Sequence, residues 1–112
     1  MSHLHELKGR IVSEASTLHD HMQIVFDSDV SLSIDTGVRI VPPSVLVGDL
    51  AGRVVDSVEE SRDEIKILFI DGVCIEIDMR PQAWRGPEAL VLQRKGRPEL
   101  VWNEAKAGGH EA

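Results

Sequence analysis

The sequence predicts a mostly β fold of antiparallel strands, and three observations support this prediction. Apolar residues alternate with polar ones, one segment of the chain recurs, and Gly or Asp stands wherever a hairpin turn is needed. We expect two tandem three-stranded antiparallel repeats plus a C-terminal hairpin, arranged as a curled sheet, a sandwich or a partly closed barrel. At 112 residues, a single domain spanning 1–112 is expected.

The recurring segment begins LKGRIV at Leu7 and LAGRVV at Leu50, an offset of 43 residues. Aligning residues 7–36 with 50–79 gives ten identities in thirty positions. Both copies must therefore satisfy one structural pattern.

The alignment sets the expected organisation of the chain. Repeat 1 covers residues 7–49 and repeat 2 covers 50–93, and one inserted residue brings PSVLV of the first onto PEALV of the second. A C-terminal hairpin strand follows at 97–102, and the tail at 105–112 is expected to be mobile.

Each copy contains two strands whose apolar residues recur with period two. These residues are Met22, Ile24 and Phe26, then Val30, Leu32 and Ile34 in copy one, and Ile65, Ile67 and Phe69, then Val73, Ile75 and Ile77 in copy two. One face of each hairpin is therefore expected to point into the core.

The register of the hairpins follows from keeping both apolar sets on one face. A three-residue loop at Ile70–Gly72 pairs Phe69 with Val73 and puts its glycine where a left-handed conformation is required. Copy one is expected to turn the same way at Asp27–Asp29, because Asp tolerates that conformation. A loop of the same form is expected at Arg94–Gly96.

The opening segment of each copy is harder to assign. A helix from Leu4 to His21 is conceivable from its polar spacing. The counterpart of Leu7–Ala15 in copy two, Leu50–Val58, is rich in Val, which favours a strand. We expect both segments to be strands.

The net charge of −7 and a pI near 5.1 make nucleic acid an unfavourable partner, because phosphate binding needs clustered Lys and Arg. The charge is uneven: residues 1–79 carry 15 acidic and 6 basic side chains, whereas 80–106 carry 6 basic and 3 acidic. We expect the C-terminal segment either to fold onto the acidic body or to compete for it.

Cys74 is the sole cysteine, so no intrachain disulfide can form. No signal-peptide pattern is present, and no apolar run approaches the roughly 20 residues that span a bilayer. We expect a cytoplasmic protein that does not enter the membrane.

His19 and His21 suggest a metal site, because a strand would place both imidazoles on one face, and His3 and His5 lie close in sequence. Copy two has Arg62 and Glu64 at the positions that match His19 and His21, so the repeat does not preserve the pair. A solvated connection is the favoured interpretation, and we expect no metal and no cofactor.

An acidic patch surrounds one loop of copy two and is interrupted by Arg62. Its members are Asp56, Glu59, Glu60, Asp63 and Glu64. A short charge run usually keeps a loop soluble. The functional alternative is a surface that steers a basic partner, and a third is that it meets the basic C-terminal hairpin of the same chain.

The segment PQAWRGP supplies a second candidate surface. Arg80, Trp84 and Arg85 belong to the residue types that anchor protein partners or bind carboxylates. Trp84 is more commonly a lid on the core. Copy two is the more two-sided repeat, because its opposite face carries Leu68 and Cys74 beside Lys66 and Glu76. This second face is expected to meet the C-terminal hairpin or a second subunit, which would make the protein a homodimer.

Arg10 and Arg53 recur at matching positions, as do Asp35 and Asp78. We expect equivalent structural salt bridges between them.

No catalytic constellation is present in the sequence. It holds no Ser, His and Asp set, no Gly-rich phosphate loop and no CxxC. Cys74 aligns with Ser31 and is expected to be an inert thiol.

The phrase L-x-G-R-x-V, followed by two alternating strands around a short Asp or Gly loop, resembles small uncharacterised bacterial β-repeat domains, some of which look like immunity proteins of toxin systems. The similarity runs from Leu7 to Met79. It transfers no functional residue and implies a binding role rather than catalysis.

We therefore expect a non-enzymatic module that binds a protein partner, in an immunity- or antitoxin-like or a regulatory role. The alternative is a small-ligand site between the repeats near Trp84 and Arg85. The residues assigned to binding are Glu59, Glu60, Asp63, Glu64, Arg80, Trp84 and Arg85.

Overall fold

The computed structural model describes residues 3–19, 21–27, 29–103 and 106–111. Its elements are η1 His3–Leu7, β1 Val12–Leu18, β2 His21–Phe26, β3 Val30–Ile34, β4 Val38–Val41, η2 Val47–Leu50, β5 Val55–Glu60, β6 Glu64–Phe69, β7 Cys74–Asp78, η3 Pro81–Ala83, β8 Glu88–Arg94, β9 Arg97–Asn103 and β10 Lys106–Glu111. The three η elements are short 3₁₀ turns. Within these ranges, no helix has the length and apolar character needed to cross a membrane.

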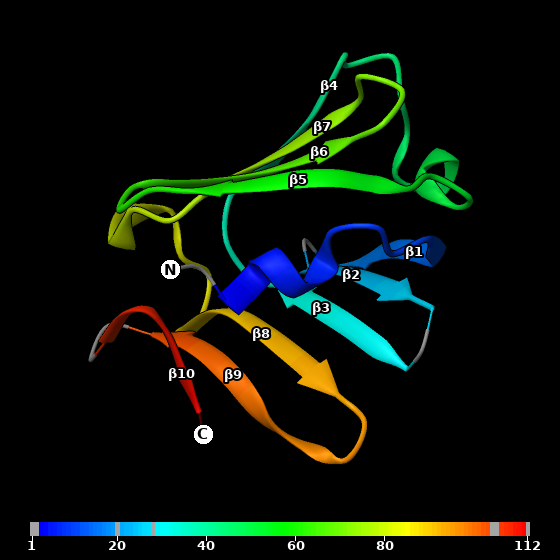
Figure 1. The fold of residues 1–112 in the computed structure, drawn as a ribbon. Helices are drawn as coiled ribbons and strands as arrows, with labels where there is room; N and C mark the ends of the chain where they lie inside the picture. The colour runs from blue at the N-terminus through cyan, green and yellow to red at the C-terminus, as the bar shows by residue number, and fades with distance from the viewer. Residues whose placement is uncertain (1–2, 20, 28, 104–105, 112) are drawn as a thin grey trace.

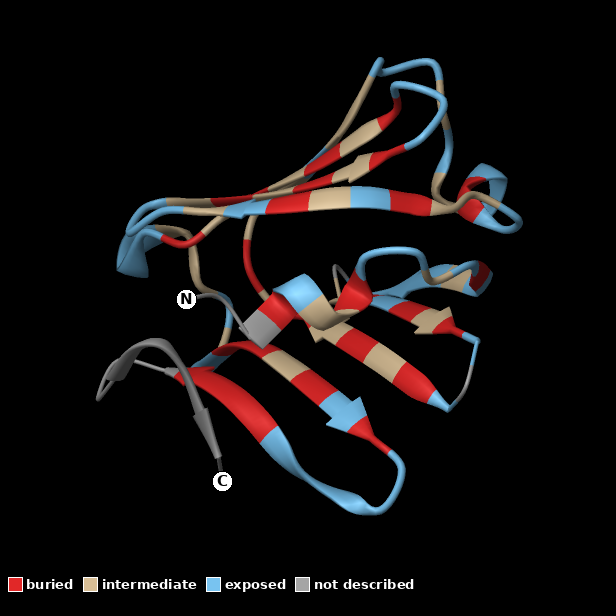
Figure 2. Cartoon of the chain, in the orientation of Figure 1, coloured by how far each residue is buried: buried red, intermediate tan, exposed pale blue. Residues whose placement is uncertain are grey.

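The strands form two antiparallel sheets that face each other (Figure 1). Sheet I has the order β1-β2-β3-β8-β9-β10, and sheet II has the order β4-β7-β6-β5. The predicted mostly β fold is confirmed, and it is sandwich-like, not a closed barrel. Figure 2 shows buried positions alternating with less buried ones along most strands, as a two-layer core requires.

The core is aliphatic and lies between the sheets. Ile24 and Leu32 of sheet I and Ile67 and Ile75 of sheet II are completely buried. These side chains belong to the alternating sets that the sequence places inward. Burial of this apolar surface is the main force that holds the two layers together.

The predicted three-residue loop at the β6–β7 turn is confirmed. Phe69 N–H donates to the Val73 carbonyl at 2.8 Å, and Gly72 has φ +92°. In copy one, Phe26 pairs in the same register across the turn that contains Asp29, whose φ is +58°.

The predicted loop at Arg94–Gly96 is wrong in length. Arg94 pairs directly with Arg97, so only Lys95 and Gly96 lie between the paired residues. A register shift between Leu92 and Arg94 absorbs the difference. A bulge of this kind lets a two-residue turn close strands whose apolar faces would otherwise be out of phase.

The predicted strands at Leu7–Ala15 and Leu50–Val58 are wrong over their first halves. The structure has 3₁₀ turns ending at Leu7 and Leu50, and β1 and β5 begin at Val12 and Val55. The glycine of each L-x-G-R phrase has a positive φ, which interrupts extended chain.

The two L-x-G-R turns hydrogen-bond reciprocally between the sheets. Gly9 N–H donates to the Val55 carbonyl at 2.8 Å, and Gly52 N–H donates to the Val12 carbonyl at 2.7 Å. The two hydrogen bonds are equivalent, because Gly9 and Gly52, and likewise Val12 and Val55, are matching positions of the two repeats. In the same way, η1 packs against β5 and η2 against β1.

The fourth strand of each half crosses to the opposite sheet. β4 follows β3 of sheet I but joins β7 of sheet II, with Val38 opposite Ile77. β8 follows β7 of sheet II but joins β3 of sheet I, with Leu90 opposite Ile34. By pairing, β8 therefore corresponds to β4.

This correspondence corrects the alignment of PSVLV with PEALV. PSVLV lies in the turn that leads into η2, whereas PEALV leads into β8. Four positions separate Ile34 from Val38, but thirteen separate Ile77 from Leu90. The longer second connection contains η3 and Trp84.

The tail takes part in sheet I. β10 pairs with β9, with Lys106 opposite Asn103 and Glu111 opposite Leu100. The pairing contains a register shift between Lys106 and His110. The mobility expected for this tail stays a prediction.

Candidate functional site

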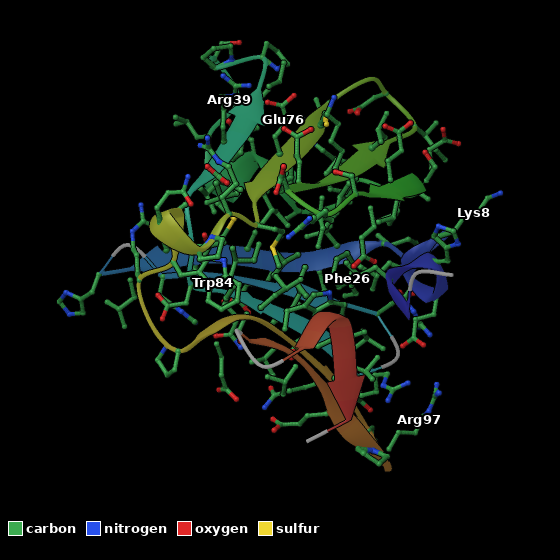
Figure 3. The ribbon with its side chains drawn as sticks, turned by 90° about the vertical axis from the view of Figure 1, so that its left-hand side faces the viewer. Lys8, Phe26, Arg39, Glu76, Trp84 and Arg97 are labelled. Carbon is green, nitrogen blue, oxygen red and sulfur yellow. The ribbon has the colours of Figure 1, made fainter. Side chains whose placement is uncertain are left out.

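Charged side chains gather over an open depression of about 580 Å³ beside strands β4 and β7 of sheet II. We call it the acidic depression, and its lining residues are Gly37, Val38, Arg39, Asp63, Glu64, Glu76, Asp78 and Arg80. Figure 3 shows Arg39 and Glu76 together at the same end of the molecule, away from Phe26 in the core.

The depression exists because the outer face of sheet II is polar at this end. Arg39 lies opposite Glu76, Glu76 opposite Lys66, and Lys66 opposite Glu59, so four strands present a row of alternating charge. Opposite charges on directly facing positions stabilise an antiparallel pair. Gly37 contributes no side chain at the edge of this row, and the Cβ atoms of Ala83 and Asp78 lie 3.7 Å from the position that a Cβ atom of Gly37 would take.

Both arginines of the acidic depression are held by carboxylates. Arg39 Nε donates to Glu76 Oε1 at 2.7 Å, and Arg80 Nη2 donates to Asp78 Oδ2 at 2.6 Å. The hydrogen bonds from Arg80 hold the pKa of Asp78 below its ordinary value. The carboxylates in turn raise the pKa of Arg39 and of Arg80.

The acidic depression keeps an excess of negative charge after this pairing. Four carboxylates line it against two guanidinium groups. Asp63 is exposed, and Glu64 is half-buried with its Oε1 3.6 Å from Lys66 Nζ. The surface is therefore suited to a cationic side chain.

Of the predicted binding residues, Asp63, Glu64 and Arg80 meet in the acidic depression. Glu59 is exposed on β5 opposite Lys66. All four belong to the outer face or the rim of sheet II.

Glu60 faces a different environment. Its Oε2 accepts a hydrogen bond from the indole Nε1 of the buried Trp102 at 3.0 Å. One acidic residue of the predicted patch thus meets the C-terminal hairpin of the same chain, through a neutral indole and not through one of the hairpin's basic side chains. Glu60 is only half-buried but is already engaged.

Trp84 and Arg85 lie in the long β7–β8 connection and do not line the acidic depression. Trp84 is half-buried against the core, and its indole Nε1 donates to the Met79 carbonyl at 3.1 Å. Arg85 Nη1 donates to the Thr36 carbonyl at 2.9 Å. This arrangement favours the interpretation of Trp84 as a lid on the core.

The expected salt bridges from Arg10 to Asp35 and from Arg53 to Asp78 are wrong. Arg53 pairs with Asp71, and Asp78 pairs with Arg80. The two arginines do behave alike: Nε of Arg10 donates to the Glu6 carbonyl, and Nε of Arg53 donates to the Asp49 carbonyl, four residues upstream in each case. Arg10 and Arg53 therefore stabilise the 3₁₀ turns η1 and η2.

The idea that His19 and His21 share a strand face is also wrong. β1 ends at Leu18, His19 is exposed with φ +51°, and β2 begins at His21. In the described part of the chain, no three His, Cys, Asp or Glu side chains come together as a metal-binding group.

Cys74 is half-buried on β7. Burial raises the pKa of its thiol, and the nearby Glu76 carboxylate adds to this effect. A raised pKa lowers the thiolate fraction and with it the nucleophilicity of the sulfur. Cys74 therefore fits the inert thiol expected from the sequence.

Sequence reasoning missed five members of the acidic depression, namely Gly37, Val38, Arg39, Glu76 and Asp78. VRIV in front of two prolines is a short strand, and its place beside β7 depends on the crossing between the halves of the chain. One sequence signal could have revealed part of the site. Glu76 and Lys66 alternate with the buried residues of their strands and lie opposite each other, which indicates a charged outer face of sheet II.

Comparison with known proteins finds no matching family model, no similar curated protein and no similar solved structure. The function of the chain is therefore inferred from its own residues.

Proposed function

We propose that this chain is a non-enzymatic protein-binding module, and that its acidic depression receives a positively charged segment of a partner protein. The resemblance to immunity-protein-like domains fits this role, as does a regulatory one. The observation that carries the proposal is the convergence of Asp63, Glu64, Glu76 and Asp78 over one open surface. The two arginines that line it and the nearby Lys66, which pairs with Glu64, offset these carboxylates only in part.

Charge supports the proposal at two scales. Over the whole chain, the net charge of −7 attracts basic partners from a distance and speeds their encounter. In the acidic depression, Asp78 and Glu76 are fixed by Arg80 and Arg39, so they present ordered oxygen atoms to an arriving cation. Ordered charges of this kind lose little side-chain entropy on binding.

The small-ligand alternative near Trp84 and Arg85 receives less support. The indole N–H of Trp84 and one guanidinium nitrogen of Arg85 already donate to backbone carbonyls of the chain. A ligand there would have to displace these contacts or use the remaining atoms.

The experiment compares two baits that lose the same charge at different places. The test variant is Asp63→Asn with Glu64→Gln, and the control is Glu14→Gln with Glu88→Gln, whose side chains are exposed on β1 and β8. Each bait captures proteins from native lysate at low and at high salt. The captured proteins are identified by mass spectrometry.

We expect wild-type protein and the control to retain a basic partner that the test variant loses. Association of that partner should slow as salt rises, because screening weakens steering between exposed charges. Equal capture by all three baits, or a partner that is not basic at the contact, would overturn the proposal. A co-purified small molecule without a protein would favour the ligand alternative.

A further inference from the structure

β4 and β8 correspond to each other, but β4 lies at the edge of its sheet and β8 lies inside its sheet. β8 pairs with β3 through Leu90 and Leu92, and β4 pairs with β7 through Val38 and Ile40. On its other side, β8 is followed in sheet I by β9 and β10. Among the described residues, β4 has no neighbour on its other side and forms the edge of sheet II (Figure 1).

The missing neighbour leaves apolar side chains of β4 incompletely covered. In sheet I, Leu100 and Trp102 of β9 lie opposite Leu92 and Leu90, and both leucines are completely buried. The corresponding residues of β4 are only half-buried although they pack against the same core. An added strand would remove this remaining apolar surface from water.

The backbone of β4 is also ready to pair. Asp78 N–H donates to the Gly37 carbonyl at 2.8 Å, while the Gly37 N–H donates to the Ala83 carbonyl at 3.2 Å, so Gly37 and Asp78 stand at a hydrogen-bonded position of the β4–β7 ladder. In an antiparallel ladder such pairs alternate with residues whose polar groups point the other way. The N–H and C=O groups of Val38 and Ile40 therefore point to the open edge.

We propose that an extended segment of the partner protein adds to β4 as an antiparallel fifth strand of sheet II, occupying the place that β9 takes beside β8. This inference rests on the proposed function and names how the partner is held. Main-chain hydrogen bonds to Val38 and Ile40 supply affinity, and alternate side chains of the partner supply specificity.

The chemistry of both faces defines the partner segment. Its inward side chains lie opposite Val38 and Ile40 and are apolar, as Leu100 and Trp102 are in β9. Of its outward side chains, the one opposite Arg39 is acidic, because opposite charges on facing positions stabilise an antiparallel pair. The outward side chain opposite Gly37 is basic, because Gly37 lines the acidic depression together with its carboxylates. The recognised segment thus alternates apolar and charged residues.

A second copy of this chain is a poor occupant of the same edge. Two β4 strands paired about a twofold axis at Arg39 would bring the two Arg39 side chains opposite each other. Like charges directly opposite destabilise an antiparallel pair. The two acidic depressions, each with excess carboxylate, would also approach one another.

The test uses two synthetic peptides of about nine residues with the same composition, a length that strand-binding sites accommodate. In one, Val alternates with charged residues, with Glu at the central charged position and Lys at the others, and in the second peptide the Val residues and the charged residues are grouped. Hydrogen exchange of single amides in isotope-labelled protein is measured with each peptide by NMR. The internal control is Val58 on β5, whose own edge faces away from the proposed strand.

We expect the alternating peptide to slow exchange at Val38 and Ile40 by about tenfold when roughly nine-tenths of the protein is bound, with Val58 unchanged, because exchange then proceeds from the free fraction. Ile40→Pro removes an edge donor without removing a bond to β7. It should abolish this protection and tight binding of the alternating peptide, while weak, salt-dependent binding of the grouped peptide remains.

Salt-dependent binding of both peptides without protection at Val38 and Ile40 would overturn strand addition and leave the proposed function standing. Failure of the alternating peptide to bind would also overturn strand addition, and the capture experiment would decide the proposed function separately. If protection of Val38 and Ile40 increases with protein concentration in the absence of peptide, and sedimentation gives twice the monomer mass, then the strand added to β4 comes from a second copy of this chain and not from a partner protein. If Ile40→Pro fails to fold, the wild-type exchange data decide by themselves.

Discussion

The indole N–H of Trp102 donates to the carboxylate of Glu60 at 3.0 Å, and this bond joins β9 of sheet I to β5 of sheet II. Trp102 is almost completely buried, so its N–H group depends on an acceptor within the protein. Glu60 accepts it at the last position of β5, next to the turn that leads to the acidic depression. A hydrogen bond between the sheets, in addition to apolar packing, therefore holds the C-terminal hairpin against sheet II.

Removing one member of this pair should destabilise the protein. Trp102→Phe removes the donor and Glu60→Gln keeps an acceptor, so we expect the first to cost about 1–3 kcal/mol of unfolding free energy and the second less. Urea denaturation of both single variants and the double variant isolates the coupling between the two side chains. Strictly additive effects would show that the bond contributes nothing of its own.

Phe26 and Phe69 should contribute comparably to stability, because both are at most 3% exposed in one core cluster. Phe→Ala at either position is expected to cost about 3–5 kcal/mol. Leu18→Ala is the control, since that side chain is 69% exposed. A denaturation midpoint that does not move for Phe26→Ala would contradict a shared core.

Gly72→Val should destabilise the β6–β7 hairpin through the backbone alone. No atom lies within 4 Å of the Cβ position built on Gly72, but its φ of +92° is unfavourable for a β-branched residue. We expect a cost of about 1–3 kcal/mol. At the matching turn, Asp29→Gly should be neutral or mildly stabilising, and unchanged thermal midpoints for both variants would show that the turn conformation is unimportant.

The pKa of Asp78 should rise toward its ordinary value of 3.8 in Arg80→Ala, because hydrogen bonds from Arg80 are the largest cause of its lowered pKa. Carboxyl NMR titration measures this change directly. A carboxylate with a lowered folded-state pKa stabilises the protein above the ordinary pKa and loses that contribution as pH falls through the folded value.

The stability difference between wild type and Arg80→Ala should therefore be largest above pH 3.8 and shrink on acidification. Arg62→Ala, which removes an exposed charge from the same region, serves as the control. A difference that persists unchanged at low pH would assign the effect of Arg80 to packing instead of charge.

Local features of this fold were predictable from the sequence, and long-range pairings were not. The register at Gly72 follows from alternation within one hairpin, which a few adjacent residues encode. The pairing of Val38 with Ile77 requires β4 to leave sheet I, which contains the preceding strand β3, and to join sheet II. No residue near β4 in the sequence indicates this crossing. Three of the eight residues that line the acidic depression were predicted, for the same reason. Asp63 and Glu64 come from one hairpin, whereas Arg39 reaches the depression because β4 crosses to sheet II.

The exchange of β4 and β8 between the sheets also determines what a broken chain could do. A cut between β4 and η2 would separate the first three strands of sheet I from β8, and the strands β5 to β7 of sheet II from β4. On the first fragment, β4 would lose β7, its neighbour in sheet II, and on the second fragment β8 would lose β3 but keep β9. The two pieces would complement each other as strand-exchanged subunits do, and in the intact chain neither sheet can be completed until both halves come together.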